Sequence, residues 1–294
     1  MKLFWRNKWM AEHRRLVCAA VVALAAFAIL GGVYCAGWLS GPGGGHRSHF
    51  KILPSEHIEY RATSWLGEAG TITVDVGPLQ EHKDGSASYR IVYTLEASKK
   101  VSAIYIMKGQ VTALIDAKTL LPLEFEEKMR TGLAITGGED KHQKLVYDRV
   151  KNEVKYYKHP RKSESKELRF KGVRKIPPNS HHFTSLLYYI RFIEFEPGKE
   201  VSVLMSDQKR DVTIKASVLR EKDYKALDGT VRKAVVLKTV TDFGKEDIEG
   251  STFHIWLDKE ERYPVRIEVK LKWGTVNVKL VKRTIKKGAT GANR

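Results

Sequence analysis

Cysteine is scarce in this chain: its 294 residues include only Cys18 and Cys35. Two cysteines exclude a disulfide-stapled scaffold and any cysteine-rich metal site. Seventeen positions apart on one helix, the two residues would lie about 25 Å from each other, which is too far for a disulfide. The rest of the chain must therefore be stable through its own hydrophobic core.

Recognisable catalytic signatures are absent as well. The sequence contains no G-x-S-x-G motif, no H-E-x-x-H motif and no phosphate-binding loop. His181 and His182 are adjacent, so they cannot both face one metal ion from a regular helix or strand, and we expect them to be exposed residues that precede a helix. The sequence therefore predicts a protein without enzymatic activity, without a metal and without a cofactor.

Negative charge is in short supply. Asp and Glu number 34 against 52 Lys and Arg, which gives a formal net charge of +18 and a sequence pI near 9.7. Such a balance favours anionic partners, namely lipid head groups, polyanionic glycans or nucleic acid, and does not choose among them.

Charged side chains are missing altogether from residues 16–45, and residues 16–38 are almost wholly apolar. As a helix, residues 16–38 would span about 34 Å, enough to cross a membrane. The basic leader, residues 1–15, predicts a cytoplasmic N-terminus and a body on the periplasmic side of the inner membrane. A cleaved signal peptide ending near Cys35-Ala36-Gly37 is the alternative, and both interpretations export the body.

The exported part is predicted to contain a Gly-rich linker (39–54), a β-rich domain (55–285) and a flexible tail (286–294). Apolar and polar residues alternate along it, which is typical of antiparallel sheet with one face in water. The predicted strands include 57–66, 71–76, 89–96, 121–130, 143–149, 153–158, 200–206, 212–218, 231–241, 252–257 and 269–273. Only 101–108 and 184–193 have helical spacing. We expect an all-β or β-dominant α+β fold, built on a large curved antiparallel sheet or a half-open barrel.

One turn pattern occurs twice. Ile115-Asp116 precedes a strand that begins at Pro122, and Leu257-Asp258 precedes a strand that begins at Pro264. The spacing predicts two hairpins in which Asp bonds to the backbone of the turn and Pro opens the returning strand. Two such copies suggest two related halves of one sheet, although turn residues also recur by chance.

Several motifs occur in a characteristic order: 60–67 (YRATSWLG), 115–122, the segment 184–191 (TSLLYYIR) with Pro197-Gly198, and 256–265. In that order they resemble a family of exported bacterial proteins, domain of unknown function 3108. The hairpins are also similar to those of the lipoprotein-localisation (LolA/LolB-like) fold, a half-open barrel that holds lipid chains. These resemblances imply a location in the bacterial envelope and no established activity.

Positive charge is concentrated in residues 149–175, where eleven Lys and Arg face three Glu. Nucleic acid is disfavoured as the partner because the predicted topology places this stretch outside the cytoplasm. An anionic membrane surface or another envelope polyanion agrees with both location and charge, and a solvated basic face is the simpler account. The candidate surface residues are Arg149, Lys151, Lys155, Lys158, Arg161, Lys162, Lys166, Arg169 and Lys171.

The helical segment 184–193 supplies the other candidate site. Its apolar residues predict burial against the concave side of the sheet, either as a plug that fills the core or as a lid over a cavity. Tyr188, Tyr189 and Arg191 are the candidate ligand-binding residues. Two hypotheses follow: a binding protein in which the sheet cups a lipid or another apolar ligand with an anionic head, or a scaffold that recruits a protein through its sheet edge or basic face.

Overall fold

The computed structural model describes residues 52–65, 67–159, 167–198, 200–206, 208–241, 252–271 and 274–285. The predicted leader, the predicted segment 16–38 and the predicted tail lie outside the described residues. Among the described residues, no helix is both long enough and apolar enough to span a membrane.

One antiparallel sheet contains all fourteen strands of the described chain. The first six are β1 (Glu56–Ser64), β2 (Gly67–Glu81), β3 (Ala87–Ala97), β4 (Tyr105–Asp116), β5 (Pro122–Leu133) and β6 (Glu139–Asp148). A hairpin of β7 (Glu153–Lys158) and β8 (Arg169–Lys175) follows. The last six are β9 (Glu200–Ser206), β10 (Asp211–Lys225), β11 (Val231–Thr241), β12 (Thr252–Asp258), β13 (Pro264–Leu271) and β14 (Gly274–Ile285). The prediction of a β-dominant fold on one large antiparallel sheet is confirmed.

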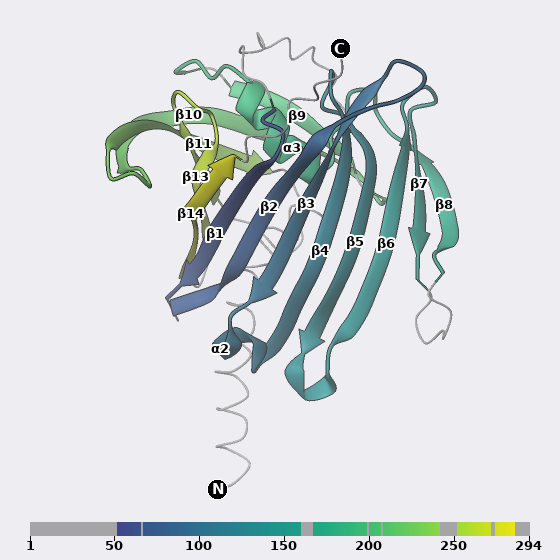
Figure 1. Ribbon diagram of the computed structural model, residues 1–294, viewed down its shortest axis with the longest axis horizontal. Coiled ribbons are helices and arrows are strands. Elements are labelled where there is room, and N and C mark those ends of the chain that lie inside the picture. The colour runs from purple at the N-terminus through teal and green to yellow at the C-terminus, as the bar shows by residue number, and fades with distance from the viewer. Residues whose placement is uncertain are drawn as a thin grey trace, which may run out of the picture.

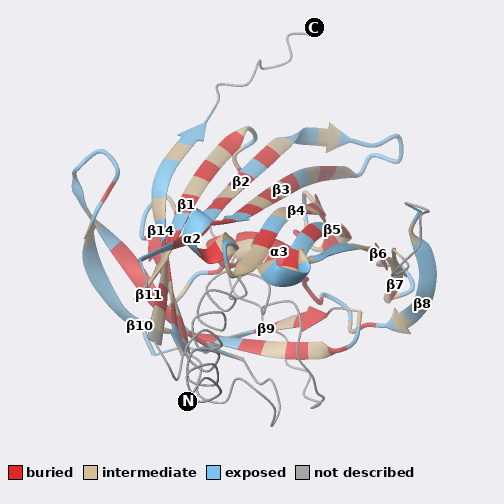
Figure 2. Cartoon of the chain, turned by 90° about the horizontal axis from the view of Figure 1, so that it is seen from below, coloured by how far each residue is buried: buried red, intermediate tan, exposed pale blue. Residues whose placement is uncertain are grey.

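The sheet consists of two meanders joined edge to edge, one of eight strands (β1–β8) and one of six (β9–β14). The strand order is β8-β7-β6-β5-β4-β3-β2-β1-β14-β13-β12-β11-β10-β9, so β1 pairs with β14 in the middle, and β8 and β9 form the two outer edges. Seen from below, the sheet curls around α3 (Phe183–Tyr189), with β8 and β9 at its ends (Figure 2). Figure 1 shows β2–β6 side by side, with β9–β11 crossing the top of the view.

The gap between the two edge strands is bridged by one short backbone pairing and by side chains. The chain that follows β8 passes beside β9, where the N–H of His181 donates to the carbonyl of Leu204 (2.7 Å) and the N–H of Ser206 donates to the carbonyl of His181 (2.7 Å). The Arg174 guanidinium on β8 reaches across to the Asp211 carboxylate through two bonds of 2.9 and 3.0 Å. The sheet is therefore an open barrel whose edges are held together by side chains and by one short bridge.

Alternation along the strands places the core inside the curve. On β2 the side chains of Ile72, Val74 and Val76 are buried, while the residues between them are more accessible. The same alternation covers β3, where Ile91, Tyr93 and Leu95 are buried. Period-two burial on one face is what antiparallel sheet with a wet outer face requires.

The two predicted hairpins form, and in both turns the Asp carboxylate accepts hydrogen bonds from the same two backbone positions. In the β4–β5 turn, the Asp116 carboxylate accepts from the N–H groups of Lys118 (3.1 Å) and Thr119 (2.6 Å). In the β12–β13 turn, the Asp258 carboxylate accepts from the N–H groups two and three residues later, at 2.9 and 2.6 Å. Leu120 and Arg262 occupy the equivalent left-handed position, with φ of 63° and 60°. Each hairpin joins the fourth and fifth strands of its meander, as two related halves would require.

The helical prediction for 101–108 is largely wrong. Only α2 (Lys99–Ser102) is helical, and β4 begins at Tyr105. Met107 is buried and pairs with Thr131 of β5, whereas Lys108 is exposed, so pairing with β5 overrides the local helical spacing. The segment 184–193 agrees better, because α3 is followed directly by the 3-10 turn η2 (Ile190–Phe192).

Besides β4, the strands β8 and β14 are not among the predicted strands. β8 carries no buried residue and four cationic side chains, so its sequence has no apolar alternation to read. It is a strand because it pairs with β7 along its length. β14 alternates more regularly and closes the two meanders together against β1 and β13.

Candidate functional site

The concave side of the sheet is filled by α3 and η2, which we call the plug (residues 183–192). Its side chains are buried on nearly all sides, with Leu187 and Tyr189 the more accessible ones. A helix that is apolar all round is a buried helix, which explains its place inside the curve. Ser185 is satisfied locally: its hydroxyl donates to the His182 carbonyl (2.9 Å) and accepts from the His182 N–H (3.1 Å).

His181 and His182 are buried, 3% exposed each, so the prediction that they are exposed is wrong. The His182 ring lies 4.0 Å from the Phe125 ring, and the His181 ring lies 4.2 Å from the Tyr189 ring. Burial lowers the pKa of His182 to about 3, so its imidazole is neutral near pH 7. The two residues are buried because the chain crosses from β8 to β9 inside the barrel before the plug begins.

An ion-pair network ties the plug to the sheet. The Arg191 guanidinium, 1% exposed, donates to the Glu56 carboxylate of β1 at 2.8 and 3.3 Å. Arg283 of β14 donates to the same carboxylate at 2.8 Å and also pairs with Glu261. Burial by itself raises the pKa of the Glu56 carboxyl, but the two guanidinium groups outweigh it and hold that pKa below its ordinary value. The Arg191 charge is thus neutralised inside the protein.

Two further hydrogen-bonded contacts hold the plug in place. The Arg262 side chain, from the β12–β13 turn, donates to the carbonyls of Arg191 (3.2 Å) and Ile193. The Tyr93 hydroxyl of β3 donates to the carbonyl of Thr184 (2.9 Å). The sheet therefore holds the plug through side chains from both meanders.

A small cavity of about 30 Å³ lies between the plug and the sheet. Its walls are mainly apolar and come from β1, β2, β3, β13 and the plug: Ile58, Tyr60, Val74, Tyr93, Leu187, Tyr188, Arg191, Pro264 and Ile267. The Tyr60 hydroxyl donates to the Pro264 carbonyl (3.0 Å). The Tyr188 hydroxyl is buried and has no hydrogen-bond partner among the described residues. Burial raises the pKa of Tyr188 well above its ordinary value, so the group remains a neutral phenol.

The three residues predicted from the helical segment do not all lie at one site. Tyr188 and Arg191 line the cavity, whereas Tyr189 packs on His181 and does not line it. Whether they bind a ligand stays a prediction. Sequence reasoning missed Glu56, the partner of Arg191. A buried arginine needs an acidic partner, but the residues around Arg191 in the sequence do not indicate which acid it is. The partner lies 135 positions away.

The candidate basic surface does not form one face. Arg149 turns inward, with its guanidinium 4.7 Å from the Tyr147 ring, and burial lowers its pKa to about 10. Lys155 lies on the outer face of β7, opposite to the buried Val154, while Lys158 and its pairing partner Arg169 lie on the face of Val154. Lys151 is in the β6–β7 turn and Lys171 is at a bulge of β8. Arg161, Lys162 and Lys166 are outside the described residues.

Within the described ranges, no group of three or more His, Cys, Asp or Glu side chains could hold a metal ion. The fold and the site together define a class: an open antiparallel half-barrel whose concave face is occupied by a short helix. The family model described as "Protein of unknown function (DUF3108)" matches residues 59–281, so the chain belongs to this family.

A solved structure shares the fold. A β-barrel-like protein of domain of unknown function DUF1849 from Brucella abortus aligns with a TM-score of 0.50 at 12% identity, covering 81% of this chain and 100% of that one. A Bacteroides fragilis protein with a YmcC-like fold aligns with a TM-score of 0.37 at 11% identity, covering 81% of this chain and 99% of that one. The search of curated proteins found no match.

Proposed function

We propose that this chain is an exported, membrane-associated binding protein of the bacterial envelope, not an enzyme, that holds an apolar ligand on the concave face of its sheet. The observation that carries the proposal is the cavity between the plug and β1–β3, with the unpartnered Tyr188 hydroxyl in its wall. Buried hydroxyls are normally hydrogen-bonded, so an unpartnered one beside a cavity indicates a missing partner.

The plug must move for a ligand to enter. A cavity of about 30 Å³ has room for about one water molecule, whereas pockets for small molecules span about 300–1,000 Å³. The plug is seven residues of α3 and three of η2, held to the sheet by a few polar contacts besides its packing. Displacing it would open the apolar concave face, which makes the plug a lid in the ligand-free state.

The charges at the site favour an uncharged ligand head. Arg191 already pairs with Glu56, and Arg283 pairs with Glu56 and Glu261, so these two guanidinium groups are already matched by carboxylates. The neutral Tyr188 hydroxyl can both donate and accept a hydrogen bond. An acyl chain with an ester or hydroxyl group therefore suits the site better than the anionic head considered from the sequence.

The scaffold hypothesis uses the sheet edge or the basic face, and one such edge is β8, which among the described strands pairs only with β7. Phe170 and Val173 are 58% and 51% exposed there. However, β8 is seven residues long, is bulged near Lys171 and is rich in cations, all of which protect natural edge strands against the addition of another strand. These features favour the ligand-binding hypothesis over recruitment through this edge.

The test compares two lipids with the same acyl chain, a monoacylglycerol and a fatty acid. The full chain is purified in detergent from the membranes of the cells that make it, and bound lipid is detected by native mass spectrometry before and after each lipid is added. We expect a bound apolar molecule, and tighter binding of the monoacylglycerol than of the fatty acid.

Tyr188→Phe should weaken monoacylglycerol binding about fivefold through the loss of one hydrogen bond. Tyr189→Phe is the matched control, because the neighbouring tyrosine does not line the cavity, and it should bind as the parent does. No adduct with either lipid in the parent, or equal effects of the two substitutions, would refute the proposal.

A further inference from the structure

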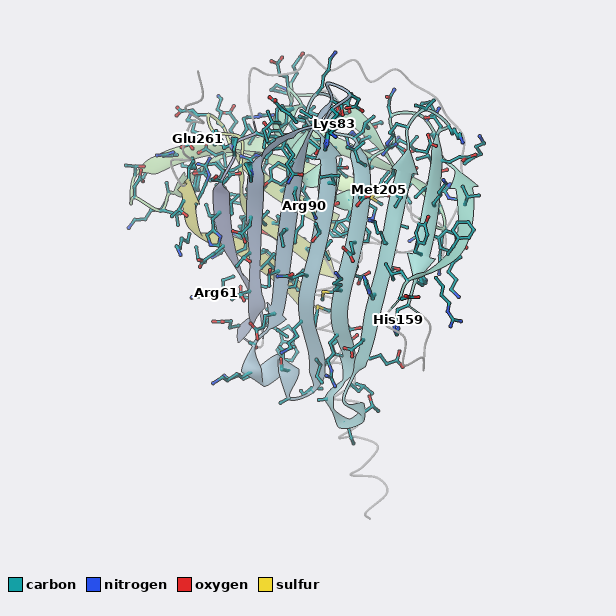
Figure 3. The ribbon with its side chains drawn as sticks, turned by 45° about the vertical axis from the view of Figure 1, so that its right-hand side comes forward. Arg61, Lys83, Arg90, His159, Met205 and Glu261 are labelled. Carbon is teal, nitrogen blue, oxygen red and sulfur yellow. The ribbon has the colours of Figure 1, made fainter. Side chains whose placement is uncertain are left out.

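Two turns at one end of the first meander expose large apolar side chains. This end is the one opposite to the β4–β5 turn that contains Asp116. Because neighbouring strands are antiparallel, the β1–β2 turn, the α2 segment between β3 and β4, and the β5–β6 turn all lie at this one end. We call it the lower rim. In Figure 3, Arg61 lies toward this end of the sheet and Lys83 lies at the other.

Trp65 in the first turn is 62% exposed, and Ile135 in the last is 92% exposed. Leu133, at the end of β5, is 45% exposed. Single exposed apolar residues are ordinary, but a row of them at one edge of a small protein is a feature of interaction surfaces. The two turns are four strands apart, so the row extends about 20 Å.

Hydrogen bonds hold the β5–β6 tip in its exposed position. The Arg130 guanidinium donates to the Gly137 carbonyl at 2.8 and 3.0 Å, and the Ala134 N–H donates to the Ile104 carbonyl at 2.9 Å. The tip therefore cannot fold back to bury Ile135 without losing these bonds. Ile135 is therefore held in an exposed position by its own turn.

Positive charge lies between the two apolar turns, and the acidic Glu68, Glu139 and Asp140 lie beside them. Lys99 and Lys100 of α2, between the two turns, are exposed and form no ion pair with another described residue. Trp side chains favour the interface of a bilayer, aliphatic side chains its hydrocarbon, and lysines its anionic head groups. A protein partner would be expected to meet a larger continuous apolar patch than a row of loop tips presents.

We infer that the lower rim docks on an anionic lipid bilayer, with Ile135 and Trp65 entering the head-group region and Lys99 and Lys100 above it. This surface is separate from the plug and its cavity, so the inference stands or falls independently of the proposed ligand.

The experiment uses the full chain with Cys18→Ala and Cys35→Ala, which leaves one introduced cysteine for a spin label. The label is placed at Ile135→Cys or, as a matched control, at Val150→Cys. Val150 is 94% exposed in the β6–β7 turn, at the opposite end of the same meander. Proteins are reconstituted in vesicles of phosphatidylcholine with or without phosphatidylglycerol. Relaxation of the label by oxygen or by a water-soluble nickel chelate then reports whether it contacts lipid or water.

With phosphatidylglycerol present, the label at 135 should contact lipid and the label at 150 should stay in water. Lys99→Glu with Lys100→Glu should lower the lipid-to-water ratio at position 135 about 25-fold, because each lysine contributes about a fivefold preference. Lys83→Glu with Lys151→Glu, at the opposite end, should leave the ratio unchanged. Circular dichroism of each variant checks that the sheet is intact.

Three results would overturn the inference. The label at 135 could remain in water with phosphatidylglycerol present, or the two lysine pairs could have equal effects. Dipolar broadening between labels at 135 in detergent alone would instead assign the rim to contact between copies of the chain.

Discussion

The two Asp–Pro hairpins make the same turn and use it differently. In the β4–β5 turn, the left-handed position holds Leu120, which is buried in the core. In the β12–β13 turn, the equivalent position holds Arg262, which bonds to the backbone of the plug, and its neighbour Glu261 pairs with Arg232 and Arg283. The β4–β5 turn contributes a side chain to the core, whereas the β12–β13 turn holds the plug.

The comparison separates the residues that decide the shape of a turn from those that decide its contacts. The carboxylate of Asp and the ring of Pro decide the shape of the turn through bonds to adjacent backbone, and these are the same in both copies. The side chains displayed by the turn decide what it contacts. Changes to the β12–β13 side should therefore disturb the plug, while equivalent changes to the β4–β5 side should not.

The largest effect should come from Glu56→Ala, which removes the carboxylate shared by Arg191 and Arg283. Taking away this carboxylate leaves the buried Arg191 guanidinium without its acidic partner, while Arg283 keeps Glu261, and a broken buried pair costs about 3–5 kcal/mol. Urea unfolding followed by intrinsic fluorescence measures the loss, and hydrogen exchange should show faster exchange in the plug than in the β4–β5 turn.

Glu68→Ala is the control for Glu56→Ala. The Arg61–Glu68 pair is 3.6 Å long, with both side chains about half exposed, so its loss should have no measurable effect on unfolding. If Glu56→Ala were equally harmless, the buried network would not be what holds the plug.

A smaller effect is expected from breaking the two turns directly. Asp116→Ala removes turn bonds only and should cost about 1–2 kcal/mol. Asp258→Ala should cost about 1–2 kcal/mol more, because buried Asp258 also accepts from the Tyr224 hydroxyl at 2.6 Å. Thermal or urea unfolding of the two variants measures the difference.

The Tyr224→Phe background provides the check on this pair of substitutions. Without the hydroxyl, Asp258→Ala and Asp116→Ala should cost similar amounts. A difference that persists in this background would mean that something other than the Tyr224 bond distinguishes the two turns.

An effect comparable in size to those of the turn substitutions concerns pH and the start of the plug. The pKa of His182 falls from its ordinary value of 6.5 to about 3 in the folded state. The neutral ring therefore contributes stability that is fully present above pH 6.5 and is lost as the pH falls toward 3, by about 1.4 kcal/mol per pH unit. Unfolding measured between pH 6.5 and 5 should show this slope.

His182→Gln should reduce the slope of the free energy of unfolding between pH 6.5 and 5. Amide hydrogen exchange in the β4–β5 turn should be the same in the variant and in the parent protein. His57 acts in the opposite direction, because its hydrogen bonds with Asp75 and Glu59 raise its pKa, and its contribution is present at low pH and lost as the pH rises. A steep slope that survives in His182→Gln would assign the acid sensitivity to other groups.

Local patterns predicted much of this fold. Alternation along 71–76 and 89–96 indicated β2 and β3, and the Asp–Pro spacing indicated both hairpins, because periodicity and turn chemistry act between near neighbours in the sequence. Pairing between strands is less local: Met107 lies in a strand because β5 is beside it, and 169–175 forms a strand because β7 offers an edge.

For the candidate site, the apolar run around Leu186 and Ile190 was enough to predict a buried helix and to single out Tyr188, Tyr189 and Arg191, of which Tyr189 does not line the cavity. The unpartnered Tyr188 hydroxyl and the burial of His181 and His182 became visible only when the plug was placed inside the sheet. Their environment comes from β5, β9 and β3, which are far away in the chain.

By itself the sequence determined the alternating strands, the two turns and the apolar helix, since each depends on residues a few positions apart. Only the tertiary structure decided that Arg191 is neutralised by Glu56, 135 residues earlier, and that one of two identical turns holds the plug. The physical reason is that charge and burial depend on what surrounds a side chain, and in this sheet most of the surroundings come from distant strands.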